Sequence, residues 1–203
     1  EVTFWNSSFY HQEKSQRSER TIEFRAPQGY RIVLLHGRAY RANVSIARVR
    51  SHQDNARSFR DAVLTEPQPD VILCGVPSLE LADSVSAYAS QRGIPLAIDC
   101  RDMWPDVIAD FLPKPVRLFA WPVLAHWRHM LNRSVRRADA VIGITDAFVD
   151  WGLEAAMRPR SALDRAFLLA PPPEQANATL AAAAREYWDR GVGAHDPTLK
   201  LGT

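Results

Sequence analysis

The chain has 203 residues, of which 46% are hydrophobic and 24% charged, the balance of a globular protein with one large domain or slightly more. This composition excludes a disordered tail, a collagen and a small disulfide-rich scaffold. The net charge of +2 gives no reason to expect a nucleic-acid partner. Residues 1–60 nevertheless hold 11 Lys and Arg against 5 Asp and Glu, so we expect any anionic partner to meet this first third.

Cysteine usage and hydropathy indicate the compartment. The two cysteines, Cys74 and Cys100, are too few for a disulfide framework, and we expect buried, inert thiols. No signal-peptide pattern is visible, and no apolar run approaches the ~18 residues that would span a bilayer. We therefore expect a cytoplasmic protein, with the inner face of a membrane as a further location. Strand-like residues at both ends, 2–5 and 199–203, lead us to expect part of a longer protein.

Apolar periodicity predicts that strands and helices alternate along most of the chain. The predicted strands are residues 2–5, 21–24, 30–36, 70–74, 95–98 and 140–144. The predicted helices begin at Ser45, at Ser78 and at Thr145 or Asp146, and a further one runs through residues 124–135. The continuous apolar run 70–74 is typical of a strand buried on both faces of a parallel sheet. The predicted fold is α/β, a Rossmann-like parallel sheet flanked by helices.

Three consecutive prolines, residues 171–173, interrupt this alternation and predict a stiff linker. We expect one domain over residues 1–170. Residues 171–203 are expected to contain the linker, an Ala-rich helix at about 176–190 and the beginning of a second domain.

The most concentrated polar cluster, residues 99–106, directly follows a predicted strand and contains three Asp, one Arg and one Trp. Ligands of open parallel sheets bind beyond the carboxyl ends of strands, and unpaired charges are costly to bury. In the functional interpretation, Arg101 or Asp102 faces a ligand hydroxyl or phosphate and Trp104 packs against the ligand. In the structural alternative, an Arg–Asp pair fixes the loop and Trp104 lies in the core.

Weaker features leave alternatives open. His11, Lys14 and Arg17 either belong to a solvated basic loop over residues 6–20 or contact an anionic acceptor. His126 and His129 have no third ligand nearby, so we predict no metal site. The stretch 117–137 mixes arginines with large apolar side chains, which fits either a core-facing helix pair or a membrane interface.

Residues 99–106, Asp-Cys-Arg-Asp-Met-Trp-Pro-Asp, resemble the D-x-R-D-L-W-P-[DE] signature of one branch of glycosyltransferase family 4. Other segments resemble this branch in the same order, and the likeness covers about residues 1–170. These segments are residues 2–14, 29–36, 40–45, 69–82, 137–140, 151 and 164–167.

The resemblance implies the N-terminal, acceptor-binding half of a GT-B enzyme, in which two Rossmann-like domains face each other across a cleft. It implies retaining transfer to a glycan or lipid-linked acceptor, with possible peripheral membrane contact, no cofactor and no nucleic acid. The nucleotide-sugar donor would bind mainly to a C-terminal domain. The implied catalytic residues are Arg101 and Asp102, and the implied substrate-binding residues are His11, Lys14, Arg17, Ser78, Trp104 and Asp106.

The chain departs from the family pattern in three ways. The first strand, which is central in such a sheet, would precede Glu1, so its two neighbours would be left with unpaired backbone groups. The paired glutamates of the donor domain have no counterpart, so we expect no turnover from this chain alone. Cys74 and Arg101 stand where most members carry a histidine, which puts a histidine base on this half in doubt.

Two other functions remain open at this point. One is a sugar-nucleotide epimerase-like GT-B protein, which would lack the Arg-Asp-x-Trp-Pro loop. The other is a non-catalytic module that uses the basic first third to bind RNA or anionic lipid.

Overall fold

The computed structural model describes residues 1–43, 45–76 and 78–168. The predicted linker, Ala-rich helix and second-domain segment lie outside these described residues.

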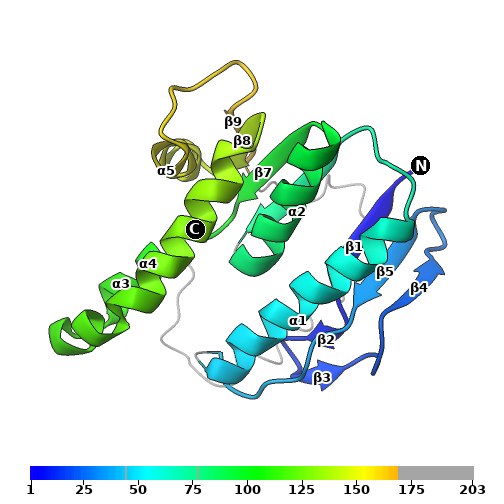
Figure 1. Ribbon diagram of the computed structural model, residues 1–203, viewed down its shortest axis with the longest axis horizontal. Coiled ribbons are helices and arrows are strands. Elements are labelled where there is room, and N and C mark those ends of the chain that lie inside the picture. Colours follow the sequence, from blue (N-terminus) through cyan, green and yellow to red (C-terminus); the bar gives the residue numbers. More distant parts are fainter. Residues whose placement is uncertain (44, 77, 169–203) are drawn as a thin grey trace, which may run out of the picture. The chain divides into compact units, whose positions relative to one another are not determined.

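The strands form two main sheets (Figure 1). In the first, β1 (Thr3–Ser7) pairs in parallel with β5 (Arg31–Leu35), and β5 pairs antiparallel with β4 (Ile22–Arg25). The second sheet is wholly parallel in the order β6-β7-β8-β9. Its strands are β6 (Ile72–Val76), β7 (Leu96–Cys100), β8 (Ala140–Gly143) and β9 (Arg165–Ala166). The predicted α/β fold with a parallel sheet flanked by helices is confirmed.

From β5 onward, helices separate the strands as the periodicity predicts. They are α1 (Ile46–Ala62), which continues into the 3-10 turn η1 (Val63–Thr65), α2 (Leu79–Arg92), α3 (Asp106–Phe111), α4 (Lys114–Arg136) and α5 (Asp146–Ala156). Ser45 caps α1, because its hydroxyl accepts the Arg48 N–H at 3.1 Å. Gly93 ends α2 in the left-handed conformation, with φ of 64°. Ser78 occupies the N-cap position of α2 but makes no side-chain capping hydrogen bond.

Two strand pairs were not predicted. The loop over residues 6–20 contains a short hairpin, β2 (Phe9–Tyr10) with β3 (Ser15–Gln16). At the far edge of the parallel sheet, two-residue β9 pairs with β8. Both elements are too short to produce a readable alternation of apolar and polar residues.

One hydrophobic core joins both sheets through the helices. The ring of Trp5 on β1 meets Phe59 of α1 edge-on at 5.3 Å, and Phe59 meets Tyr88 of α2 at 6.1 Å. Since α1 packs on β5 and α2 packs on β6, this aromatic chain connects the first sheet to the second.

The expectation that β6 is buried on both faces is wrong. Cys74 and Val76 point into the core, whereas Leu73, on the opposite face, is 63% exposed. Successive side chains of a strand point to opposite faces of the sheet. No described element covers the face to which Leu73 belongs, so the side chains on that face of β6 are exposed to solvent.

Within the described ranges, β1 and β4 are the edges of the first sheet, and β6 and β9 are the edges of the parallel sheet. Edge strands expose backbone N–H and C=O groups that can pair with another chain. We therefore expect the 203-residue chain to unfold irreversibly on heating, with light scattering that rises with protein concentration. Leu73→Lys, which places a charge on the exposed face of β6, should raise the temperature at which scattering begins. Reversible, cooperative unfolding of a monomer, followed by circular dichroism, would contradict this prediction.

Candidate functional site

The segment over residues 99–106 lies where the sequence predicts it, at the carboxyl end of a parallel strand. Val76, Cys100 and Gly143 stand side by side in β6, β7 and β8. The loops that follow these three residues therefore share one edge of the sheet, the edge at which open parallel sheets bind ligands.

Arg101 forms the pair that the structural alternative describes. Its Nε donates to Asp99 Oδ2 at 2.5 Å, and Asp99 is only 6% exposed. The Arg101 side chain is otherwise mostly in solvent. Asp102 differs, because it is half-buried and no hydrogen bond to its carboxylate is found in the part of the chain that the structure describes. Asp102 is therefore the uncommitted carboxylate of the segment.

Asp106 begins α3 and is held by two neighbours. Its Oδ2 accepts a hydrogen bond from Trp151 Nε1 at 2.7 Å and also pairs with the Arg128 guanidinium. Because Arg128 lies on α4 and Trp151 on α5, Asp106 ties three helices together at the end of the loop. These contacts give Asp106 a positioning role for the Trp104 loop.

Trp104 belongs to a cluster of aromatic rings and cations that includes one predicted site residue from the first third of the chain. The Arg48 guanidinium lies 4.8 Å from the Trp104 ring centroid and 6.0 Å from that of Tyr40. Lys14 Nζ lies 4.9 Å from the same Tyr40 ring and donates to Asn43 Oδ1. Lys14 and Trp104, 90 positions apart in the sequence, are thus connected through Tyr40 and Arg48.

The other two cationic candidates are not part of this cluster. Arg17 is exposed and stacks over the ring of Tyr10 at 4.5 Å, on the β2–β3 hairpin. His11, in the turn of the same hairpin, is exposed. The structure therefore joins only Lys14 of these three residues to the 99–106 segment.

A groove of about 930 Å³ opens beside Trp104, between α1, α2 and the α3–α4 region. Its apolar lining is formed by Ile46, Val49, Ala56, Leu79, Trp104, Ile108, Pro122, Val123, Trp127 and Met130. Its polar lining includes Arg48, His52, Arg57, Arg60, Glu80 and His126. Arg101 and Asp102 do not line it, so the predicted catalytic pair stands outside the groove while Trp104 forms part of its wall.

Two polar atoms at this edge are buried and find no hydrogen-bond partner among the residues with described placement. They are Ser78 Oγ, at the start of α2, and Arg48 Nε, next to Trp104. Buried polar atoms are nearly always hydrogen-bonded in folded proteins. Both atoms are themselves covered by protein, so their unpaired state does not by itself mark a binding site, and Ser78 stays a prediction. Arg48 joins the candidate set because its guanidinium lies over the Trp104 ring and lines the groove.

Sequence reasoning did not single out Arg48 as a site residue. It also missed the pair His52 Nδ1 and Glu80 Oε2, 3.7 Å apart in the polar wall of the groove. The signal for both was helical periodicity: Arg48 and His52 are four residues apart on α1 and thus share one side of the helix.

The thiols of Cys74 and Cys100 are unreactive. Burial raises the pKa of Cys74 to about 12, and burial together with the nearby Asp99 carboxylate raises the pKa of Cys100 to about 12. Thiols with such pKa values stay protonated at neutral pH. Both are free and buried, as predicted, and neither is a candidate nucleophile.

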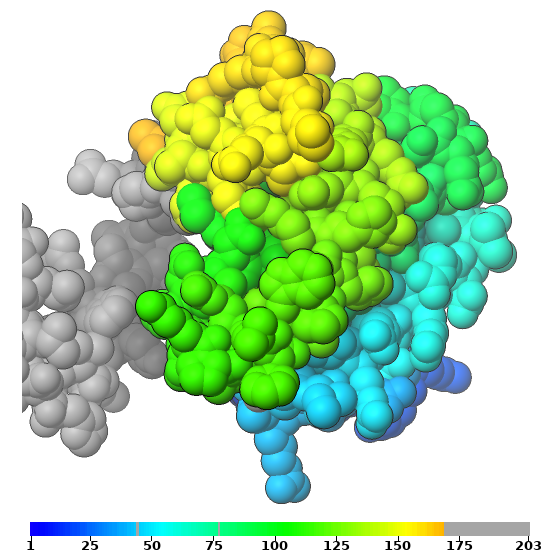
Figure 2. Space-filling view, turned by 60° about the vertical axis from the view of Figure 1, so that its left-hand side comes forward, coloured from blue at the N-terminus to red at the C-terminus, as the bar shows by residue number. Residues whose placement is uncertain are grey.

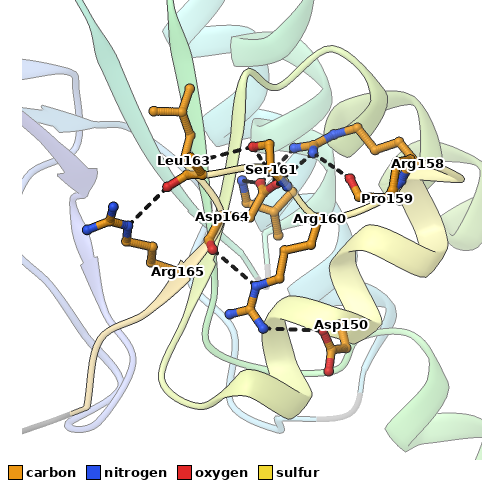
Figure 3. Close-up of polar contacts among 10 residues, drawn as sticks. Asp150, Arg158, Pro159, Arg160, Ser161, Leu163, Asp164 and Arg165 are labelled. Atoms are coloured by element: carbon orange, nitrogen blue, oxygen red, sulfur yellow. Dashed lines mark hydrogen bonds and ion pairs between the residues drawn. The ribbon is translucent and has the colours of Figure 1, made fainter.

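The carboxylate with the most perturbed surroundings, Asp164, was not singled out as a site residue (Figure 3). Its two oxygens accept hydrogen bonds from both terminal nitrogens of Arg158 and from the Val141 N–H, each at 2.7 Å. They also accept hydrogen bonds from the N–H and the hydroxyl of Ser161, at 2.7 and 2.8 Å. Burial by itself would raise the pKa of Asp164, but these hydrogen bonds outweigh it and hold the pKa well below its usual range. With all its acceptor positions occupied, Asp164 fastens β8 and the loop after α5 and has no capacity left for a ligand.

No group of three His, Cys, Asp or Glu side chains that could hold a metal ion is found among the described residues. None of the described helices is long and apolar enough to cross a membrane. In comparisons with known proteins, no family model matches this chain and no curated protein matches it in sequence.

Proposed function

We propose that this chain forms the acceptor-binding side of a retaining glycosyltransferase, which moves a sugar from a nucleotide-sugar donor to a glycan or lipid-linked acceptor. The observation that carries the proposal is the position of residues 99–106 at the carboxyl end of β7 with the Asp102 carboxylate uncommitted. The resemblance of this segment to the glycosyltransferase signature is the reason for proposing sugar transfer as the reaction.

The proposed roles follow from the contacts. Transfer breaks the bond from the anomeric carbon to the donor phosphate oxygen and forms a bond from that carbon to the acceptor oxygen, whose proton passes to the departing phosphate oxygen. Asp102 would accept a hydrogen bond from the acceptor hydroxyl and orient it. Lys14 and Arg48 would hold an acidic group of the acceptor, and Trp104 would pack against its apolar or sugar face. Donor binding is assigned to a second domain.

The test is a transfer assay with radiolabelled nucleotide sugars on the complete gene product. Asp102→Asn keeps the shape of the side chain and removes its charge, so we expect turnover to fall by about a hundredfold. Asp61→Asn, an equivalent change at an exposed position of α1, should leave turnover unaltered. Equal activity of the Asp102→Asn protein and the wild type would remove Asp102 from the site.

The cluster of Lys14, Arg48 and aromatic rings also fits a module that binds an anionic polymer without catalysis. Such a module would shift RNA in a salt-dependent manner, and the complete protein would transfer no sugar. That combination of results would replace the transferase proposal.

A further inference from the structure

Strand β4 is an outer edge of the first sheet, and no described strand pairs with its free side. Its residues Glu23, Phe24 and Arg25 are all exposed, Phe24 to 45%. Figure 1 shows β4 at the margin of this sheet, on the far side from α3 and α4. A free strand edge is a surface on which a strand of another chain can pair.

The backbone groups of β4 point alternately toward β5 and toward the free edge. The Ala26 N–H donates to Tyr30 O at 2.9 Å, so these two residues face each other as a hydrogen-bonded pair. Such pairs alternate with non-hydrogen-bonded pairs along an antiparallel ladder, and the backbone of Phe24 therefore also bonds toward β5. The N–H and C=O groups of Glu23 and Arg25 consequently point to the free edge, where a second strand would accept and donate.

The side chains along this edge are complementary to a second copy of themselves. In a symmetric dimer, two copies of β4 run antiparallel about an axis perpendicular to the sheet, so that opposite residues lie on the same face. The central registers place Glu23, Phe24 or Arg25 opposite its own copy. The first and the last of these bring two like charges together, which is unfavourable. With Phe24 on the axis, each Glu23 instead lies opposite the Arg25 of the other copy.

We propose that this protein forms a homodimer through β4, with Phe24 on the two-fold axis. The pairing joins the two three-stranded sheets into one. Two pairs of opposite charge lie on one face and a contact between the two Phe24 rings lies on the other, and both kinds of cross-strand pair stabilise a sheet. Phe4, Ile32 and Phe24 are neighbours across the first sheet, so the dimer continues this apolar row from one copy into the other.

The charges of β4 select one register and do not prevent pairing. Glu23 and Arg25 form ion pairs of 3.1 Å with Arg31 and Glu1 of their own chain. The side chains of Glu23, Arg25 and Glu1 are 62–66% exposed, and ion pairs so exposed contribute little to stability. Both charges of β4 can therefore turn to a second copy at small cost.

The other described edges do not specify a partner in this way. Strands β1 and β6 contain no charged residue, so they favour no particular register. Strand β9 has only two residues. The self-complementary order of charges is thus found at β4 alone among the described edges, which is the reason for choosing a second copy as the partner.

A strand of four residues makes a small interface, so we expect association that is weak and depends on concentration. Figure 2 looks onto the green surface of α3 and α4 below the yellow surface of α5, and little of the blue first sheet is visible there. Pairing through β4 leaves that surface free. The proposal is independent of the transferase function, because neither donor nor acceptor takes part.

The test is analytical ultracentrifugation of the 203-residue chain over a range of concentrations. The wild type should dimerise. Glu23→Arg and Arg25→Glu should each raise the Kd of the dimer by about tenfold or more, because each converts two attractive pairs into two repulsive ones. Glu13→Arg, an equivalent change at an exposed position of the β2–β3 turn, is the matched control and should dimerise as the wild type does.

Two further samples test the register itself. An equimolar mixture of Glu23→Arg and Arg25→Glu should dimerise again, since the cations of one variant then face the anions of the other at both positions. The double variant Glu23→Arg/Arg25→Glu exchanges the two charges within one chain and should also dimerise. Restored dimers in either sample require folded protein, so they separate a lost contact from misfolding.

Three outcomes would overturn the proposal. The first is a wild type that stays monomeric up to about 0.5 mM. The second is a dimer whose Kd neither Glu23→Arg nor Arg25→Glu changes, which would place the interface elsewhere. The third is loss of the dimer in the single variants with no recovery in the mixture or in the double variant.

Discussion

Replacing Asp164 with alanine is expected to lower the free energy of unfolding by about 3 kcal/mol, since it removes one partner of a buried ion pair. The Asp164 side chain is fully buried, and the change would leave the Val141 N–H, the Ser161 hydroxyl and the Arg158 guanidinium without their acceptor. Arg158 is partly exposed and regains some hydration, which sets the loss at the lower end of the usual range. In urea unfolding the midpoint concentration should fall by about 1 M or more.

The dependence on pH separates this ion-pair effect from loss of packing. The folded-state pKa of Asp164 lies below its unfolded value of about 3.9. Its stabilising contribution is therefore complete above about pH 5 and is lost as the pH falls through 4 and below. The difference in stability between wild type and Asp164→Ala should shrink over the same range. Asp150→Ala, at an exposed carboxylate 3.7 Å from Arg160, is the control and should change the midpoint little. A difference that stays constant from pH 7 to pH 3 would contradict the ion-pair explanation.

Gly152→Val is expected to destabilise the fold by about 3 kcal/mol through overpacking. A Cβ atom at Gly152 of α5 would stand 2.7 Å from Val141 Cγ1 and 3.0 Å from Cys100 Sγ. These are core side chains of β8 and β7, so α5 must move away from the sheet to admit the larger residue. The adjacent Trp151 would move with it and lose its hydrogen bond to Asp106.

Denaturant unfolding measures the stability change, and Trp fluorescence reports the rearrangement near Trp151. Gly75→Val is the matched control, because no atom lies within 4 Å of a Cβ built at Gly75 and valine is well suited to a strand. If the Gly152→Val protein is as stable as the Gly75→Val protein, then α5 does not pack against β7 and β8 as closely as described.

Much of the fold could be predicted from local patterns. The continuous apolar run 70–74 and the helical spacing after Ser45 are both clear in the sequence, and the structure has β6 at Ile72–Val76 and α1 at Ile46–Ala62. The exposure of Leu73 could not be predicted, because an apolar run does not tell whether one face or both will be covered. Burial depends on which helices lie over the sheet, and that is decided by tertiary packing.

The location of the candidate site in the fold could be predicted from the sequence, but the contacts between its side chains could not. The charges of residues 99–106 after a strand indicate the sheet edge, and the segment lies there. The contact of Arg48 with Trp104 depends on how α1 lies against a loop more than 50 residues away, and no local spacing encodes that. The same holds for Asp106, whose partners Arg128 and Trp151 come from two later helices.

The contact between Arg48 and Trp104 has a mechanical consequence. Arg48 belongs to the helix that covers one sheet and Trp104 to a loop of the other, and no described strand bridges the two. A ligand bound beside these two residues would contact both α1 and the Trp104 loop, and would therefore connect the parts of the protein that carry the two sheets. Because the ligand would bind only the folded protein, its binding would raise the free energy of unfolding by mass action, and tighter binding would give a more stable protein.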